Sequence, residues 1–215
     1  MFKSIPPIIP LFRFELDSFL GRKLSAKCSF NPTDKVYLNL GSGPVKLKNF
    51  VNADFYVGIK CKFWKKHFKP DWQLDLRYPL NCKDRIFQGI YSSHTLEHLT
   101  YEEVNRILHE IYRTLRDTGW LRLCLPDLRK YINFYLTLEG EGKFKTWESG
   151  CEAIHNLTQN HGHKSVWDLN LIEKYLIDAG FRNIKETQFM VGTDPILSID
   201  NQDRVWESFY IEAQK

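Results

Sequence analysis

The sequence lacks several features that would place it in a special structural class. Its 215 residues contain no internal repeat and no low-complexity segment. The apolar run Ile5–Pro10 is too short and too rich in proline to span a membrane, and the small-residue cleavage site of a signal peptide is missing. The five cysteines are odd in number and form no Cys-x-x-Cys pair. That usage argues against a disulfide framework and favours a reducing compartment, so we expect a cytoplasmic protein.

A strong charge of either sign is also missing. The net charge is only +4, which does not by itself imply a nucleic-acid partner. The apolar fraction of 43% and the aromatic fraction of 14% are values of a globular domain with a sizeable core. We expect one domain over residues 36–215, preceded by an N-terminal helical extension over residues 1–35.

The N-terminal extension has one amphipathic stretch. Residues 11–24 can form a helix with Phe12, Leu16, Phe19 and Leu20 on one face. We expect this helix to lie over the edge of the sheet or over a ligand, and weak peripheral contact with a membrane surface through residues 1–24 is the alternative.

A glycine-rich turn follows the first predicted strand. Val36–Leu40 indicates a buried parallel strand, and Gly41 and Gly43 come directly after it. Glycine lets the backbone turn sharply and approach a ligand closely. In open α/β sheets this strand-and-glycine pattern typically marks a nucleotide-binding loop at the carboxyl ends of the strands.

Two acidic residues stand near the ends of the next two predicted strands. The segment 51–54 ends at Asp54, and the segment 73–76 contains Asp75. Carboxylates at these positions suit ribose hydroxyls and adenine edges. A dinucleotide fingerprint would need a third glycine and a more distant acid, so this spacing disfavours NAD.

Strands and helices alternate through the rest of the chain, which predicts an α/β fold. Thr100 and Glu103 form a capping box for the best-defined helix, and further helices are expected over 128–138 and 169–179. Strands are expected over 86–91, 120–125, 184–191 and 205–213, and a loop over 139–150. The basic, aromatic segment 60–69 is expected to be a solvated loop or helix with its aromatic side chains turned inward, and the alternative is that it grips phosphates and stacks bases. The alternation over 208–212 fits an antiparallel sheet edge.

Six motifs together resemble the class I S-adenosylmethionine-dependent methyltransferases. They are LNLGSG (38–43), VNAD (51–54), DLRYPL (75–80), SSHTLEHL (92–99), LRDTGWLRLCLPDL (115–128) and AGF (179–181). The sequence looks closest to a small bacterial, type-11-like group with a Leu-Asn-Leu-Gly-x-Gly first loop. The resemblance implies a Rossmann-like, seven-stranded, mostly parallel sheet with an antiparallel last strand and helices on both faces. The sequence departs from the usual family pattern at Asn39 and Gln88, where acids are common.

The resemblance also implies a set of cofactor contacts for S-adenosylmethionine. Leu40, Gly41, Ser42 and Gly43 would pass beneath the methionine portion. Asp54 would bond the ribose hydroxyls, Asp75 and Leu76 would flank the adenine, and Ser93 and His94 would face the sulfonium.

Three side chains are candidates for a general base. His94 is the first candidate because it follows the fourth strand at the expected mouth of the cofactor site, and it could alternatively only pack or orient the cofactor. Asp127 and His163 are second-line candidates. For His98 we expect a structural role, and Glu97 could cap the following segment or bond the methionine amine.

The sequence predicts no metal site. Cys151, His155, His161 and His163 are close in sequence, but their spacing matches no zinc pattern. Trp147 and Trp167 could line an acceptor pocket or belong to the core.

The expected acceptor is a small molecule or a saccharide, methylated at oxygen. Ser92-Ser93-His94 replaces the Asp/Asn-Pro-Pro-aromatic loop of enzymes that methylate amines of nucleic acids, and no Pro-Cys nucleophile is present, so a nucleic-acid acceptor is disfavoured. A cofactor- or partner-binding module without turnover on the same fold is the alternative. A nucleotide-linked enzyme of another class, such as a reductase, is weakened by the missing third glycine.

Overall fold

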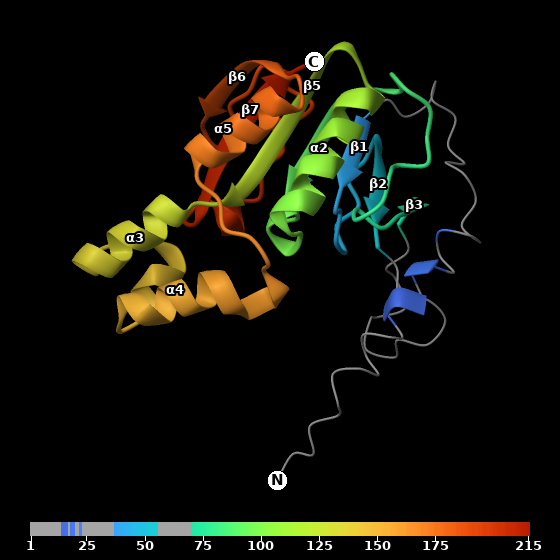
Figure 1. Ribbon diagram of the computed structural model, residues 1–215. Coiled ribbons are helices and arrows are strands. Elements are labelled where there is room, and N and C mark those ends of the chain that lie inside the picture. Colours follow the sequence, from blue (N-terminus) through green and yellow to red (C-terminus); the bar gives the residue numbers. More distant parts are fainter. Residues whose placement is uncertain (1–13, 17, 20–21, 23–36, 56–69) are drawn as a thin grey trace.

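The computed structural model describes residues 14–16, 18–19, 22, 37–55 and 70–215, and these form an α/β fold (Figure 1). Val36, the segment 60–69 and most of the expected N-terminal helix lie outside the described residues. The division of the chain at residue 35 therefore stays a prediction.

Seven strands of the described residues form one sheet in the order β3-β2-β1-β4-β5-β7-β6. Their bounds are β1 (Tyr37–Leu40), β2 (Phe50–Asp54), β3 (Trp72–Gln73), β4 (Phe87–Ser93), β5 (Leu115–Pro126), β6 (Arg182–Thr187) and β7 (Ser208–Gln214). Strands β1 to β5 pair in parallel, and β7 is antiparallel to both β5 and β6. The expected Rossmann-like sheet with its antiparallel last strand is confirmed.

The strand order reverses between β1 and β4, which are neighbours in the sheet. The chain runs outward from β1 toward β3 and then crosses back to β4. In open α/β sheets, ligands bind beyond the carboxyl ends of the strands at such a point. The loops after β1 and β4 therefore frame the site.

Helices of the described residues connect these strands. They are η1 (Leu96–His98), α2 (Tyr101–Thr114), α3 (Leu128–Thr137), η2 (Gly142–Thr146), α4 (Gly150–Gln159), η3 (Asn160–Gly162), α5 (Leu169–Asp178) and η4 (Gln202–Arg204), where η marks a 3-10 helix. Helix α2 begins at the predicted capping box, in which Thr100 and Glu103 bond each other's backbone amides. The predicted helices over 128–138 and 169–179 are confirmed as α3 and α5.

The third strand was placed too far along the chain, and one helix was not expected. The third strand pairs with β2 only through Trp72 and Gln73, so Asp75 lies beyond the strand. The chain turns there, because the amide of Tyr78 donates to the carbonyl of Asp75. Helix α4 was not expected; the Ser149 hydroxyl caps it by accepting from the amide of Cys151.

Apolar side chains cover the two faces of the sheet differently. Helices α2 and α5 lie side by side on one face (Figure 1), where Ile107, Ile111, Ile172 and Leu176 are buried. On the other face Leu197 packs with residues of β2 and β4. Each such side chain contributes about 1.5–3 kcal/mol by leaving water.

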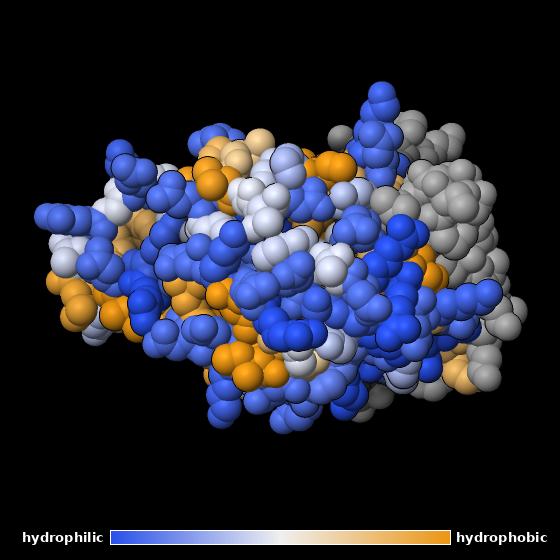
Figure 2. All heavy atoms as spheres, turned by 90° about the horizontal axis from the view of Figure 1, so that it is seen from above, coloured by the Kyte–Doolittle hydropathy of each residue, from blue (hydrophilic) through white to orange (hydrophobic). Residues whose placement is uncertain are grey.

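Helices α3 and α4 form a small separate unit that projects from the carboxyl end of β5 (Figure 1). They enclose their own cluster of buried side chains: Tyr131, Phe134, Phe144, Ala153 and Leu157. Helix α3 exposes Leu136 and Tyr135. Figure 2 shows apolar patches on a largely hydrophilic surface, one of them at the end of the molecule where α3 lies. The unit leaves and rejoins the sheet at one place, because Asp127 forms a parallel bridge with Trp167.

None of the helices within the described residues is long and apolar enough to cross a membrane.

Candidate functional site

The glycine turn after β1 is packed tightly against the loop after β4. The amides of Gly41 and Ser42 both donate to the carbonyl of Ala53, at 2.9 and 3.0 Å. Gly41 has a φ of 73°, and a Cβ placed on it would lie 2.1 Å from Oγ1 of Thr95. Only glycine satisfies both the left-handed backbone and this close approach. The sequence indicated the glycine but not its partner Thr95, although Thr95 stands within the SSHTLEHL motif.

Gly43 lies at the open side of the same turn, beside Asp54. Its φ is 53°, and a Cβ placed on it would meet no atom within 4 Å. Its amide donates to Oδ2 of Asp54 at 2.6 Å, and the amide of Phe55 donates to Oδ1 at 2.6 Å. Burial raises the pKa of Asp54 more than these two hydrogen bonds lower it. The carboxylate is thus held at the rim of the glycine turn.

Asp75 is hydrogen-bonded both to its neighbour Arg77 and to Ser18 in the N-terminal segment. It accepts hydrogen bonds from the backbone amide and the guanidinium of Arg77, and its Oδ2 accepts from the hydroxyl of Ser18. Burial works to raise the pKa of Asp75, but the hydrogen bonds from Arg77 and Ser18 and the charge of Arg77 lower it overall. Glu15 also pairs with Arg77. The described residues of the N-terminal segment therefore contact the turn after β3, and Leu76 stands half-buried in that turn.

His94 directly follows Ser93, the last residue of β4, with a φ of 49°. A non-glycine residue in this region carries strain, which commonly marks functional sites. The hydroxyl of Ser208 donates to the carbonyl of Arg204 at 2.6 Å, so Nε2 of His94 must donate to Ser208 across their 2.8 Å contact. Burial works against a charged ring, but contacts with Cys124 and Glu97 outweigh it and raise the pKa of His94 to about 10.

Glu97 lies in η1 with only 1% of its surface exposed. In the part of the chain that the structure describes, neither carboxylate oxygen has a hydrogen-bond partner. Nδ1 of His94 lies 3.4 Å from Oε1, which is an ion-pair contact and long for a hydrogen bond. A buried polar group left in this state calls for an explanation.

Two histidines stand beside this carboxylate. The ligand atoms of Glu97, His98 and His163 all lie within 4.8 Å of one another. The rings of His98 and His163 meet edge to face, with 4.9 Å between their centroids. Burial, with the charges of His163 and His161, lowers the pKa of His98 against the raising effect of Glu97 and of the Gly162 backbone. The neutral imidazole therefore prevails at neutral pH.

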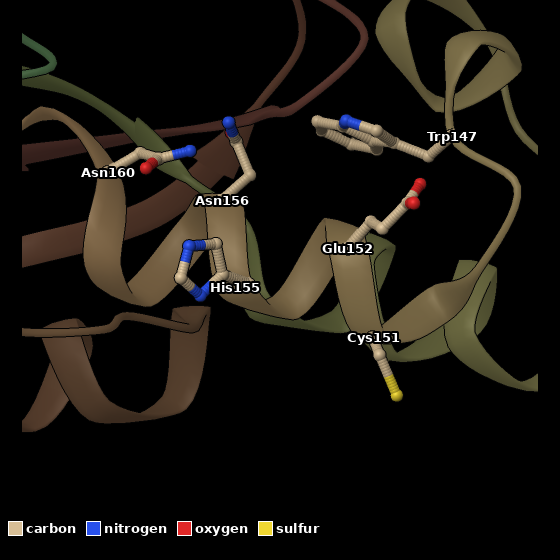
Figure 3. A pocket seen from close by; sticks show the side chains of 6 residues that line it. All are labelled: Trp147, Cys151, Glu152, His155, Asn156 and Asn160. Carbon is tan, nitrogen blue, oxygen red and sulfur yellow. The ribbon is translucent and has the colours of Figure 1, made fainter.

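The other side chains proposed from the sequence cap a helix, belong to the core or border a surface hollow. Asp127 caps α3 by accepting from the amide of Arg129 at 2.9 Å. Trp167 is buried in the core with 1% exposure. Trp147 borders a surface hollow of about 520 Å³ on α4, where Asn156 and Asn160 also line the wall and the Cys151 thiol points away from the indole ring (Figure 3).

The structure thus brings some predicted residues together and separates others. His94 contacts Glu97, and Glu97 is adjacent to His98 and His163. Of the four residues close in sequence, only His163 joins such a group among the described residues; Cys151 and His155 are exposed on α4. Sequence reasoning missed the grouping because His163 is far from Glu97 along the chain.

Comparisons with known proteins agree with this geometry. Residues 48–123 match the family model described as "Methyltransferase domain". No curated protein matches the chain in sequence. The expected resemblance to class I S-adenosylmethionine-dependent methyltransferases is therefore confirmed, although the match to the family model covers only part of the chain.

Two solved structures have the same fold over nearly the whole chain. One is a S-adenosylmethionine-dependent methyltransferase from Archaeoglobus fulgidus, with a TM-score of 0.53 and 17% identity over 94% of each chain. The other is a S-adenosylmethionine-dependent methyltransferase from Thermotoga maritima, with a TM-score of 0.52 and 16% identity over 97% of this chain and 95% of that one. At these identities the similarity is one of fold.

Proposed function

We propose that this chain is a S-adenosylmethionine-dependent methyltransferase that acts on a hydroxyl of a small-molecule or saccharide acceptor. The observation that carries the proposal is the glycine turn at the point where the strand order reverses, with Asp54 held at its rim by the amide of Gly43. The match of residues 48–123 to the methyltransferase family model supports it independently.

The cofactor would lie across the carboxyl ends of β1, β2 and β4. Leu40, Gly41, Ser42 and Gly43 would support the methionine portion, and the space beside Gly43 is open for it. Asp54 would accept from the ribose hydroxyls, since each of its oxygens keeps a lone pair beyond its bond to a backbone amide. Asp75 and Leu76 would flank the adenine, and Ser93 and His94 would face the sulfonium.

Methyl transfer from a sulfonium is an in-line displacement in which the donor supplies the activated group. The protein mainly has to align the acceptor oxygen with the methyl carbon and exclude water. Such alignment supplies about 7–11 kcal/mol of the barrier reduction. A base that removes the acceptor proton adds about 10²–10⁴-fold.

His94 is the candidate base by position. Because its pKa is raised to about 10, the ring is charged at neutral pH, so it would take the acceptor proton only at higher pH and would otherwise orient the cofactor or acceptor as a donor. Asp127 accepts from the amide of Arg129 as a helix cap, and His163, whose Nε2 keeps its lone pair, lies on the segment after α4. His94 instead stands directly at the end of β4, beside the glycine turn. A His94→Gln variant keeps a donor for Ser208 and removes the titrating ring, so kcat should fall and should lose any rise with pH toward about 10, while cofactor binding persists.

An acceptor oxygen, rather than an amine of a nucleic acid, is supported by the chain at the end of β4. Ser92, Ser93 and His94 occupy the place where amine-methylating enzymes of nucleic acids carry a proline-rich loop. A screen of sugars, nucleotide sugars and phenols with a labelled methyl donor tests this part of the proposal.

The cofactor site itself is tested by calorimetry with S-adenosylhomocysteine. Asp54→Ala should weaken binding at least about tenfold, because a hydrogen bond to a charged group contributes about 1.5–3 kcal/mol. Asp84→Ala, which removes a largely exposed carboxylate, is the matched control and should leave binding unchanged. Equal affinity in Asp54→Ala and Asp84→Ala would overturn the site assignment.

A further inference from the structure

The buried carboxylate of Glu97 has a coordination environment that the methyl-transfer chemistry does not require. Its two oxygens have no hydrogen-bond partner among the described residues, although only 1% of the residue is exposed. Burying a carboxylate is costly unless it is paired or binds a metal ion. The nearest charged group, His94, reaches one oxygen only at 3.4 Å.

The two histidines next to Glu97 supply nitrogen ligands. The ligand atoms of Glu97, His98 and His163 lie within 4.8 Å of one another. Ligands at the usual zinc distances of about 2.0–2.2 Å lie about 3.3–3.5 Å apart in a tetrahedral site. Metal binding would therefore require the three side chains to rotate toward one another.

The orientation of His163 is the one that a metal ligand needs. Its Nδ1 lies 2.7 Å from the carbonyl of Leu157, and because a carbonyl only accepts, Nδ1 must carry the hydrogen. The lone pair of the neutral ring is therefore on Nε2. Metal-binding histidines are commonly fixed in this way by a backbone carbonyl on the far nitrogen.

The backbone holds the two contributing segments together. The amides of Lys164 and Ser165 donate to the carbonyl of Glu97 at 2.8 and 3.1 Å. The hydroxyl of Ser165 in turn accepts from the indole nitrogen of Trp167 at 2.8 Å. His163 is thereby placed beside η1 without the metal. His98 and His163 are only partly buried, which leaves a way in from solvent.

We propose that Glu97, His98 and His163 bind one divalent transition-metal ion of the Zn²⁺ class, linking the end of β4 to the segment after α4. Two imidazoles and one carboxylate favour Zn²⁺, Co²⁺ or Fe²⁺ over Mg²⁺ and Ca²⁺, which prefer oxygen ligands. Three protein ligands leave a further position for water or for an oxygen of a bound molecule. The metal site does not depend on the proposed methyl transfer.

The test measures metal binding by the full chain without an affinity tag. The protein is treated with a chelator, dialysed and titrated with Zn²⁺ in competition with a coloured chelator, and with Co²⁺ by its visible absorption. We expect one equivalent of either ion to bind and Zn²⁺ to raise Tm. Mg²⁺ should do neither.

Variants at the three ligands and a matched histidine decide the assignment. Glu97→Gln, His98→Ala and His163→Ala should each weaken Zn²⁺ binding by at least about 100-fold, because even changes around a ligand cost 10–100-fold. His155→Ala, at an exposed histidine of α4, should bind like the unchanged chain. Glu97→Gln keeps the size of the side chain, so a loss of binding with an unchanged circular dichroism spectrum is not explained by unfolding.

Two results would overturn the metal site. One is the absence of stoichiometric Zn²⁺ and Co²⁺ binding by the unchanged chain. The other is equal affinity in His163→Ala and His155→Ala. Loss of S-adenosylhomocysteine binding in Glu97→Gln, without any metal binding, would instead assign Glu97 to the cofactor amine. Binding of S-adenosylhomocysteine by the unchanged chain tests the methyltransferase proposal separately.

Discussion

Two buried groups of charged side chains in this protein are built in opposite ways. In the interior near β5 and β7, Arg122 pairs with both Asp200 and Glu212, and all three side chains are fully buried. At the carboxyl ends of β1 and β4, Glu97 is equally buried, but its oxygens have no hydrogen-bond partner in the described residues.

The interior group is satisfied in detail. Arg122 also donates to the carbonyls of Gln188 and Val191, while backbone amides of Met190 and Thr193 donate to its two carboxylate partners. The group thereby fixes the segment after β6 against the sheet. At the carboxyl end, by contrast, the backbone is strained at His94, a non-glycine residue with a φ of 49°. We infer from this difference that the Arg122 group stabilises the fold, whereas Glu97 is available to bind a ligand.

The largest effect is expected for Arg122→Leu. Removing the guanidinium leaves two buried carboxylates unpaired, and breaking a buried ion pair in this way costs about 3–5 kcal/mol. Urea denaturation followed by circular dichroism measures the loss. Arg106→Leu, at an exposed position of α2, is the control and should change stability by less than about 0.5 kcal/mol. A similar small change in Arg122→Leu would contradict a structural role.

A smaller effect is expected for Gly41→Ala. The new methyl group would meet Thr95 at 2.1 Å and the φ of 73° disfavours alanine, so we expect a loss of about 3 kcal/mol and of cofactor binding. In Gly43→Ala the positive φ also strains the backbone, but the new methyl group meets no other atom, so we expect a loss of stability of about 1 kcal/mol. Thermal unfolding and calorimetry with S-adenosylhomocysteine compare the two. Equal stability of the two variants would mean that the contact with Thr95 does not matter.

Asp75→Asn should produce a smaller and pH-dependent loss. The pKa of Asp75 is lowered in the folded chain, so its stabilisation is present above the unfolded pKa of about 3.9 and is lost as pH falls through the folded value. We expect Asp75→Asn to lose about 1.5–3 kcal/mol at pH 7, a difference that narrows on acidification. Denaturation at a series of pH values measures it.

Asp54→Asn provides the contrast for that series. Because the pKa of Asp54 is raised, ionisation of Asp54 opposes folding above the folded pKa. Asp54→Asn should therefore not show the pattern of Asp75→Asn, in which stability is lost at pH 7 and the loss narrows on acidification. A parallel pH dependence in the two variants would refute the assigned directions.

The smallest change in stability is expected for Glu97→Gln in metal-free buffer. An amide costs less to bury than a carboxylate, which offsets the loss of the 3.4 Å ion-pair contact with His94, and no hydrogen bond within the described residues is lost, so the change should stay below about 1 kcal/mol. Glu212→Gln, at an equally buried glutamate, weakens the pairing with Arg122 and should cost about 1.5–3 kcal/mol. A greater loss in Glu97→Gln than in Glu212→Gln would reverse the comparison.

Local patterns made most of the fold predictable. The capping box of α2 depends on two residues three positions apart, and the sequence indicates it. Helix α4 was missed because its sequence has glycine, cysteine and asparagine where a helix usually has stronger formers. The third strand was placed too far along because its pairing with β2, not its composition, decides where it ends.

The candidate site could be proposed from the sequence where its residues belong to one continuous motif, but not where residues far apart in the chain come together. Gly41, Gly43 and Asp54 could be proposed because each lies at the end of a predicted strand or just after it. The contacts of Ser18 with Asp75 and of His163 with Glu97 join residues that are far apart in sequence, so no local spacing reveals them.

The bridge between Asp127 and Trp167 has an evolutionary consequence. The segment from Leu128 to Val166 leaves the sheet and returns to it at the same position, and it has a small hydrophobic core of its own. Such a segment can be lengthened, shortened or exchanged without changing the distance between its two ends at the sheet. Related proteins can therefore differ in this segment, provided that the replacement again delivers two amides to the carbonyl of Glu97.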